Sequence, residues 1–527
     1  MVTLRSSFRS ATFARTVRVM SSRRHIRHPF AALSLALATP LCAGCGSDGP
    51  LVQLTDEVTI VPLTARVSPA DPRNPTRPDT QQQLIDEGFG DYTFGSGEPH
   101  QMIVVGGAPR PADGPSPRRL ARFAHMPDLQ LADDEAVTRV VFIDAPGISS
   151  SSSRPQDTYG CHMVNAMVRT LNEVHGRDAL DFVLLGGDNI DNAQTNELAW
   201  ALQLLGDGGT IECDSGVDND PIPGPQNDPK DPFEAVGLDV PFYWVMGNHD
   251  VLIQGNFAVT EEQKATSVGG FASVRTRDWS QPGGPFANSV PADPMREALT
   301  ATEVIERVVA HDGGHGLSAT QAASGRAFYT FDVPGTPIRF VIIDTTAAAT
   351  GGAEGLLRSS DRDLLVAALD QAEADGKWVM LASHHAARSL TTTGGTFGTI
   401  DDPDAVTTAE FTDLVTSYEN VLFSFVGHSH QHRIAELTGN GRVVVEVMTA
   451  AVADFPHQSR IVEIWDMDNG WVMLRGTAVN FSTRRDALAE EARRLGIMDY
   501  TTGWADENPS MLTDRNVEIF LPAPSTP

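Results

Sequence analysis

Short apolar runs, each ending in a polar cluster, recur through the middle of the chain. Those that have the length of β-strands are 182–185, 242–246, 340–343, 378–381 and 421–426, with further runs at 442–447 and 460–465. Segments of helical period separate them, as where Met163, Met167 and Leu171 recur at a spacing that places them on one buried helix face. Strands alternating with helices predict a layered α/β fold, in which ligands gather at the strand ends.

The flanks of this region differ in composition. Residues 45–118 are rich in Pro, Asp, Arg and Gly and hold one short apolar run at 58–63, so we expect a tether with at most an edge strand. Residues 119–480 are expected to form the main domain and residues 481–527 a C-terminal extension. With 41% hydrophobic residues in 527, a large core is available.

The first 45 residues predict export. Basic residues at Arg23, Arg24 and Arg27 precede an apolar run at 30–41 that is too short to span a bilayer. The residues 42–45 that follow resemble a bacterial lipobox, in which Cys45 would take the lipid. We therefore expect a signal peptide over 1–44, with Met20 as an alternative start of translation, and a lipoprotein anchored to the membrane and facing the periplasm or cell exterior. An ordinary secretory signal is the alternative.

Two cysteines remain after such processing, Cys161 and Cys213. An exported pair can form a disulfide, but sequence gives no distance, so pairing stays open. No Cys/His zinc-finger spacing surrounds them, which disfavours a thiolate metal site.

The formal charge is strongly negative. Thirty-nine basic against 68 acidic residues give -29 at pH 7, a field that repels phosphate backbones. Nucleic acid is therefore not the expected partner. The oligomeric state is left open.

Five polar clusters carry the residues suited to chemistry. They are Asp128-Leu129-Gln130, the stretch 187–192, Gly247-Asn248-His249-Asp250, His384-His385, and Gly427-His428-Ser429-His430. Mixed carboxylate, imidazole and amide ligands suit borderline divalent metals such as manganese, iron, cobalt or zinc.

In this order the clusters resemble the signature of the calcineurin-like metallophosphoesterase family, over about residues 119–480. The resemblance implies an α/β fold with two mixed β-sheets packed as a sandwich and flanked by helices. It also implies a hydrolase that cleaves phosphomonoesters or phosphodiesters with two divalent metal ions and a metal-bridging hydroxide.

The resemblance also implies roles for individual residues. Asp188 would bridge the metals, and the remaining ligands would be Asp128 and His430 for the first metal, and Asn248, His384 and His428 for the second. His385 competes with His384 but is expected to be its neighbour in the outer shell. His249 would protonate the leaving alkoxide or donate a hydrogen bond to the phosphoryl group, and Asp250 would orient its ring.

Gln130 departs from the family pattern, which has histidine there in an Asp-x-His motif. Its carbonyl oxygen is a weaker donor to a metal than imidazole, so we expect a weaker first metal or a water in place of the side chain; whether Gln130 ligates stays open. Some branches of the family resemble this chain in reading Asp-x-Gln. Asp191 stands where purple acid phosphatases have the tyrosine that binds ferric iron, so this chain is not expected to be purple.

Gln130 alone supports a rival interpretation, a lipid-anchored, non-catalytic metal- or ligand-binding protein with the same fold. The otherwise complete set of ligands and the proposed acid favour an enzyme. A nuclease of the same family is disfavoured by the charge. Three arginines, Arg388, Arg433 and Arg460, follow the last motifs and are expected either in salt bridges or near a substrate phosphate. His125 is expected to be a core histidine.

Overall fold

The computed structural model describes residues 50–216, 222, 224, 227–506 and 514–525. The predicted signal segment 1–44 and the lipid site Cys45 lie outside these residues. No helix in the described part of the chain has the length and apolar character needed to cross a membrane.

An eight-stranded mixed sheet forms one layer of the fold. Strands β5, β6 and β9 at one side of this sheet are parallel to one another. Strand β22 runs antiparallel beside β5, and β23 runs antiparallel beside β22. In spatial order the strands are β4 (Gln101–Val104), β24 (Val517–Pro522), β23 (Trp471–Asn480), β22 (Gln458–Asp466), β5 (Arg118–Met126), β6 (Phe182–Leu185) and β9 (Phe242–Tyr243), with β1 (Gln53–Leu54) paired to β23.

A six-stranded mixed sheet forms the other layer. Strands β15, β16, β19 and β21 are parallel, and an antiparallel strand closes each edge. In spatial order they are β14 (Tyr329–Asp332), β15 (Ile338–Ile342), β16 (Trp378–Ala382), β19 (Val421–Val426), β21 (Arg442–Met448) and β20 (Arg433–Gly439).

The two sheets pack face to face through aromatic rings. The ring of Phe123 on β5 lies 5.4 Å from that of Phe340 on β15 and 5.3 Å from that of Phe425 on β19. Edge-on aromatic pairs of this kind add stability beyond the area they bury. The predicted sandwich of two mixed sheets is confirmed.

Residues of the six-stranded sheet alternate between two cores. Phe340 and Met380 face the eight-stranded sheet, whereas their neighbours Val341 and Leu381 face a second cluster formed with helices. Because successive side chains point to opposite faces and both faces are covered, these strands are apolar throughout. This is why their runs were visible in the sequence.

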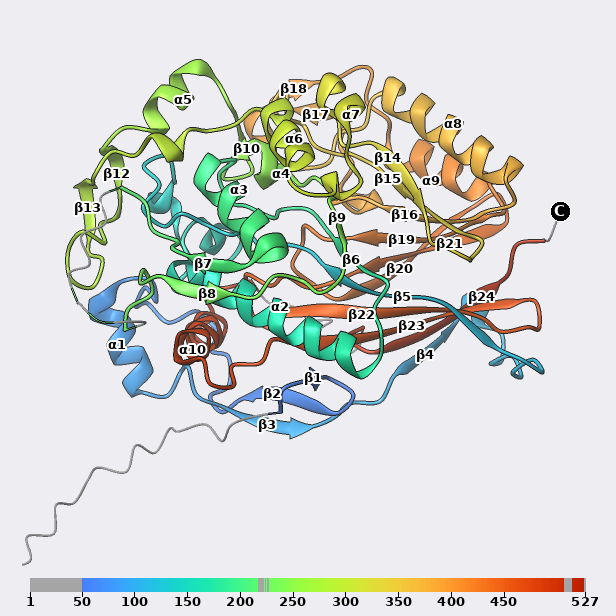
Figure 1. Ribbon diagram of the computed structural model, residues 1–527, viewed down its shortest axis with the longest axis horizontal. Helices are drawn as coiled ribbons and strands as arrows, with labels where there is room; N and C mark the ends of the chain where they lie inside the picture. The colour runs from blue at the N-terminus through green and yellow to red at the C-terminus, as the bar shows by residue number, and fades with distance from the viewer. Residues whose placement is uncertain (1–49, 217–221, 223, 225–226, 507–513, 526–527) are drawn as a thin grey trace, which may run out of the picture. The chain divides into compact units, whose positions relative to one another are not determined.

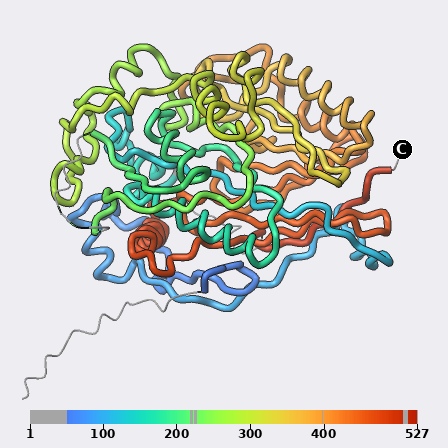
Figure 2. Tube along the Cα trace, in the orientation of Figure 1, coloured from blue at the N-terminus to red at the C-terminus, as the bar shows by residue number. Residues whose placement is uncertain are grey.

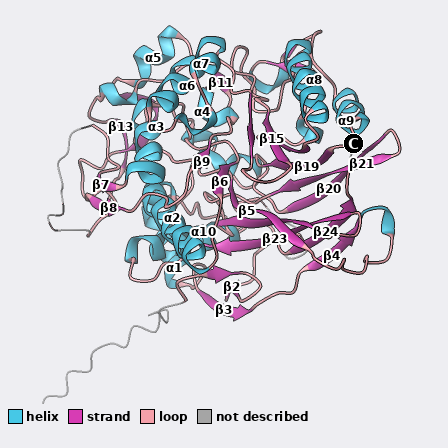
Figure 3. Ribbon diagram, turned by 45° about the vertical axis from the view of Figure 1, so that its right-hand side comes forward, coloured by secondary structure: helices cyan, strands magenta, loops and turns pink. Residues whose placement is uncertain are grey.

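Helices cover the sheets. Helices α8 and α9 pack on the six-stranded sheet, and α2 lies beside α10 against the eight-stranded sheet (Figures 1 and 3). Thr407 and Glu410 form a capping box that starts α9. The helices are α1 (Pro78–Asp86), α2 (Gly160–Arg177), α3 (Thr195–Leu202), α4 (Asn248–Val251), α5 (Glu261–Ser267), α6 (Ala301–Ala310), α7 (Ala319–Ser324), α8 (Ser359–Ala374), α9 (Thr408–Ser417) and α10 (Ala487–Thr501).

Five two-stranded pairs decorate the connections. They are β2 (Val58–Pro62) with β3 (Tyr92–Ser96), β7 (Gly209–Ile211) with β8 (Phe233–Ala235), β10 (Leu252–Ile253) with β11 (Phe257–Ala258), β12 (Phe271–Arg277) with β13 (Phe286–Ser289), and β17 (Thr393–Gly394) with β18 (Ile400–Asp401).

The expectation of a tether over 45–118 is wrong for the part of that segment that the structure describes. Strands β1 and β4 join the eight-stranded sheet, where β4 pairs with C-terminal β24, and Leu84 of α1 packs with Leu495 and Met498 of α10. Figure 2 shows these N-terminal segments, in blue, beside the red C-terminal ones. The two flanks of the predicted domain thus complete one sheet and one core.

Cys161 on α2 and Cys213 after β7 form a disulfide, with a sequence separation of 52 residues. In the chain-entropy account, closing a loop of that length stabilises the folded state by about 4 kcal/mol. Both cysteines lie in the main core.

Candidate metal centre

Each predicted cluster lies directly after a strand. Asp128 and Gln130 follow β5, Asp188 follows β6, Asn248 opens α4 after β9, His384 follows β16, and His428 and His430 follow β19. Within each sheet these strands are parallel neighbours, so their carboxyl ends meet at one edge. The sandwich brings the two edges together.

The side chains converge at hydrogen-bond distances or slightly beyond. Nε2 of His384 lies 3.1 Å from Oδ2 of Asp188, and Nε2 of His430 lies 3.5 Å from Oδ1 of Asp128. Ligand atoms of Asp128, Asp188 and His384 all lie within 4.8 Å of one another, as do those of His384, His385 and His428. This spacing suits ions held between carboxylates and imidazoles.

One buried oxygen without a partner and one imidazole nitrogen beside a carboxylate are left for a cation. The Nδ2 group of Asn248 donates to the Gly255 carbonyl at 3.1 Å, while its Oδ1 has no hydrogen-bond partner among the described residues. Nδ1 of His384 donates to the Gly186 carbonyl at 2.8 Å, which leaves Nε2 facing Asp188. A buried acceptor without a partner costs about 1–3 kcal/mol. A divalent metal would remove that cost, so the residues fit the ions.

The backbone at the centre is strained. Five predicted ligands adopt positive φ: Asp128 (54°), Gln130 (37°), Asp188 (53°), His428 (73°) and His430 (53°). Residues other than glycine rarely occupy this region, and where they do the strain often belongs to a functional site.

Two glycines allow the loops to approach one another. A Cβ on Gly247 would lie 2.2 Å from the backbone nitrogen of Asp188, and one on Gly255 would lie 2.3 Å from Cδ2 of His249. Both contacts are closer than a carbon atom tolerates, so these positions require glycine.

The carboxylates dominate the electrostatics. Burial disfavours charged imidazole, but the carboxylates of Asp188 and Asp128 outweigh it and raise the pKa of His384 to about 9. In the same way Asp128 and Asp454 overcome burial and raise the pKa of His430 to about 10. The centre therefore attracts positive charge strongly.

His249 is held by Asp191. Its Nδ1 donates to the Asp191 backbone carbonyl at 2.9 Å and lies 3.1 Å from the Asp191 carboxylate. Burial disfavours the imidazolium, but Asp188 and Asp191 outweigh it and raise the pKa of His249. Since Nδ1 carries the proton, Nε2 is the nitrogen left to exchange one.

The expectation that Asp250 orients the His249 ring is wrong. The Asp250 carboxylate instead accepts hydrogen bonds from the backbone of Gly247 at 2.8 Å, Asn189 at 2.8 Å and Ile190 at 3.1 Å. It is fully buried and ties two ligand-bearing loops together.

His385 and His125 are held by hydrogen bonds to neighbouring residues. His385 hydrogen-bonds Thr345 Oγ1 at 2.7 Å and the Ala353 carbonyl at 2.8 Å, so both ring nitrogens are engaged. His384 is thus the member of the pair that faces Asp188. His125 is buried and hydrogen-bonds Thr449 Oγ1 at 2.9 Å, as expected of a core histidine.

Asp454 and Arg154 were not predicted as parts of the centre, and the contact of Asp191 with His249 was not predicted either. Asp454 Oδ2 lies 2.5 Å from Nδ1 of His430, and its Oδ1 accepts from Nε of Arg154 at 2.6 Å. Asp191 lies within the polar cluster 187–192, and this position was the one indication in the sequence of a role at the centre. Arg154 follows a serine stretch, and Asp454 comes six residues after β21, so neither carries a local pattern.

The three candidate arginines differ in their surroundings. Arg433 forms a salt bridge with Glu446 at 2.7 Å, and Arg460 is buried and donates to His432 and to the Asp514 carbonyl. Arg388 is exposed and lines a hollow of about 410 Å³ together with Glu354. Glu354 Oε2 lies 3.7 Å from Nε2 of His428, so this hollow adjoins the centre.

Comparison with known proteins agrees with this geometry. The sequence model of the family described as calcineurin-like phosphoesterase matches residues 121–432. Because the match spans more than half of the chain, the chain belongs to that family. Membership in this family of metal-dependent phosphoesterases implies a hydrolase and divalent metal ions.

Similar solved structures are distant. They include purple acid phosphatase PPD1 from yellow lupin (12% identity, 73% of this chain and 55% of that chain, TM-score 0.30). Others are GAP50 of Plasmodium (10%, 75% and 98%, 0.30) and the sulfate thiohydrolase SoxB of Thermus thermophilus (13%, 74% and 60%, 0.28). The chain spans little more than half the length of the lupin enzyme. No curated protein matches the sequence.

Proposed function

We propose that the protein hydrolyses small phosphomonoesters or phosphodiesters at a centre of two divalent metal ions. The observation that carries the proposal is the buried oxygen Oδ1 of Asn248, which has no hydrogen-bond partner among the described residues, together with His384 Nε2 at 3.1 Å from Asp188 and 4.0 Å from Asp128. A binding protein without turnover has no need of the adjoining His249, held at Nδ1 and free to exchange a proton at Nε2.

Asp188 lies between two ligand sets. Its Oδ2 faces His384, while its Oδ1 accepts from the His249 backbone nitrogen at 2.8 Å, which fixes the carboxylate plane. We assign Asp128 and His430, whose Oδ1 and Nε2 lie 3.5 Å apart, to one set. We assign Asn248, His384 and His428 to the other, and the rings of His384 and His428 lie 5.2 Å apart. When bound, the metals would act as Lewis acids and lower the pKa of a coordinated water.

The chain's own residues then supply orientation and proton transfer. Asp191 holds the His249 ring so that Nε2 can give a proton to the leaving oxygen. The hollow beside His428 is lined by Glu354, Arg388, Ser389, Leu390 and Thr391. A cavity of that size and polar character suits the leaving group of a small ester, with Arg388 as a partner for an anionic substituent.

Hydrolysis of nitrophenyl phosphate and of bis(nitrophenyl) phosphate tests the proposal. After loading with manganese or zinc, the full chain is expected to turn over at least one of these esters and to lose that activity on chelation. Metal content measured on the same sample provides the control. Protein that holds two metals and turns over neither ester would overturn the proposal.

We propose further that the protein is exported and anchored through a lipid on Cys45. The Cys161–Cys213 disulfide supports this, because disulfides persist in oxidising compartments outside the cytoplasm.

Expression in a bacterium with lipoprotein processing tests the anchor. The wild-type chain is expected in the membrane fraction with Cys45 as an acylated N-terminus, and Cys45→Ala is expected to leave that fraction. Cys42→Ala is the matched control and should behave as wild type. An N-terminal peptide that retains residues before Cys45 would contradict the proposal.

A further inference from the structure

The orientation of the Gln130 amide is fixed by Arg154. Nη2 of Arg154 lies 2.5 Å from Oε1 of Gln130, and the side-chain amide nitrogen Nε2 of Gln130 lies 3.4 Å from Oδ2 of Asp188. A guanidinium has donors only, so the amide atom that faces it has to be the oxygen. Gln130 therefore turns its N–H group, and not its carbonyl, toward the carboxylate that both metals are proposed to share.

Arg154 is itself firmly held. Its side chain is 1% exposed, its Nε donates to Asp454 at 2.6 Å, and Asp454 in turn holds Nδ1 of His430. A planar guanidinium can bind Asp454 and Gln130 at once because its donors form a rigid fork. The same arginine thus links the Gln130 amide to a histidine of the predicted first set.

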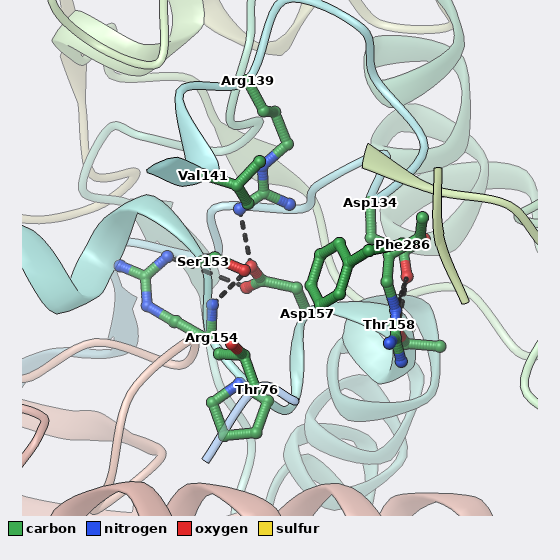
Figure 4. A pocket seen from close by; sticks show the side chains of 11 residues that line it. Thr76, Asp134, Arg139, Val141, Ser153, Arg154, Asp157, Thr158 and Phe286 are labelled. Carbon is green, nitrogen blue, oxygen red and sulfur yellow. Dashed lines mark hydrogen bonds and ion pairs between the residues drawn. The ribbon is translucent and has the colours of Figure 1, made fainter. Parts of the chain in front are cut away.

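The space around Arg154 leaves the guanidinium little room to move away. Figure 4 shows the Asp157 carboxylate between Arg139 and Arg154, where it accepts from Arg139 Nη2 at 2.6 Å and from the Arg154 backbone nitrogen at 2.9 Å. The cavity that these residues line has a volume of about 10 Å³, enough for about one water molecule. Rotation of Arg154 would also separate its buried charge from the half-buried carboxylate of Asp454, which is costly.

We infer that Gln130 is not a metal ligand but a hydrogen-bond donor at the centre, and that Arg154 is the positioning residue that holds it so. The amide nitrogen carries two hydrogens, so one can face Asp188 while the other serves a phosphoryl oxygen of the ester; that part rests on the proposed function. An amide N–H aimed at developing negative charge stabilises it without reorganisation. Where the family's Asp-x-His motif has a histidine that binds metal, this chain then has a glutamine that donates a hydrogen bond.

The metal content of the Gln130→Ala variant distinguishes a metal ligand from a hydrogen-bond donor. We expect the variant to bind as many manganese ions as the wild type, with affinity reduced by no more than about 10–100-fold, which is the usual cost of removing a residue that supports a ligand without touching the metal. Its kcat is expected to fall about 10²-fold, as for loss of one oxyanion donor. Metal analysis and the Mn(II) EPR signal give the readout, with exposed Gln371→Ala on α8 as control.

Arg154→Lys tests the positioning role. A lysine keeps the charge beside Asp454 but cannot also bind Gln130 Oε1, so kcat should fall to the level of Gln130→Ala. The double variant should then fall no further, since the two residues act as one unit. A double variant whose loss equals the product of the single losses would overturn the role of Arg154.

The metal measurement does not depend on the ester. Loss of one metal equivalent in Gln130→Ala shows that Gln130 is a ligand and overturns the inference, whatever the activity. If the wild type holds its metals and hydrolyses no phosphate ester, the proposed function is overturned. The metal content of Gln130→Ala then still decides whether Gln130 is a ligand. If Arg154→Lys does not fold, as its thermal melt would show, the count in Gln130→Ala still decides.

Discussion

Replacing Asn248 with alanine is expected to lower metal occupancy and to reduce kcat/KM by at least about 10³-fold, because a metal ion supplies several kcal/mol of transition-state stabilisation. Asn248 is 1% exposed, and its Oδ1 is a buried acceptor without a hydrogen-bond partner among the described residues. Alanine removes that oxygen and also the donor to the Gly255 carbonyl. Metal analysis of the purified variant and steady-state kinetics measure the two effects.

Exposed Asn288 on β13 is the matched control for this substitution. Its Nδ2 also donates to a backbone carbonyl, that of Ala272 at 2.9 Å, so Asn288→Ala loses a similar hydrogen bond away from the centre. The control is expected to keep its metal and its activity. If Asn248→Ala retained full metal content, the assignment of its oxygen as a ligand would be wrong.

The central strands could be predicted because both of their faces are buried. The runs at 182–185 and 421–426 coincide with β6 and β19, and that at 378–381 lies within β16. A strand covered on both sides is apolar throughout and stands out against any background. The clusters at their ends were visible for the same reason, since each begins where an apolar run stops.

The edge of the sheet could not be predicted in this way. Met102 of β4 is 52% exposed and the strand has only four residues, so its pattern does not differ from that of a polar linker. Its place beside β24 depends on a pairing between segments more than 400 residues apart. Such a pairing produces no recognisable pattern in the sequence of either segment. The composition of residues 45–118 therefore predicts a tether.

Partners within the centre show the same limit. Sequence placed Asp250 beside His249 because they are adjacent, yet the carboxylate that holds the ring is that of Asp191 from another loop. Likewise the sequence shows that residue 130 is a glutamine near the predicted metals. The direction in which its amide points depends on Arg154, 24 residues away. Sequence motifs predict which residues are candidate metal ligands, whereas the orientation of each side chain depends on how the residues around it pack.

Replacing His249 with alanine is expected to reduce kcat by about 10²–10⁴-fold without loss of metal, as for removal of a general acid. The ring is held through Nδ1 by Asp191 and is 15% exposed at the side chain, so Nε2 can reach a leaving group.

The size of the loss should depend on the ester. A nitrophenolate leaves without help, whereas an alkoxide needs a proton, so the variant should lose more activity on an alkyl phosphate than on nitrophenyl phosphate. Half-buried His175 on α2, whose Nδ1 accepts from the Leu180 backbone, provides a control that should change neither rate. Equal losses on both esters would instead assign His249 a hydrogen bond to the phosphoryl group, and a drop in metal content would make it part of the ligand set.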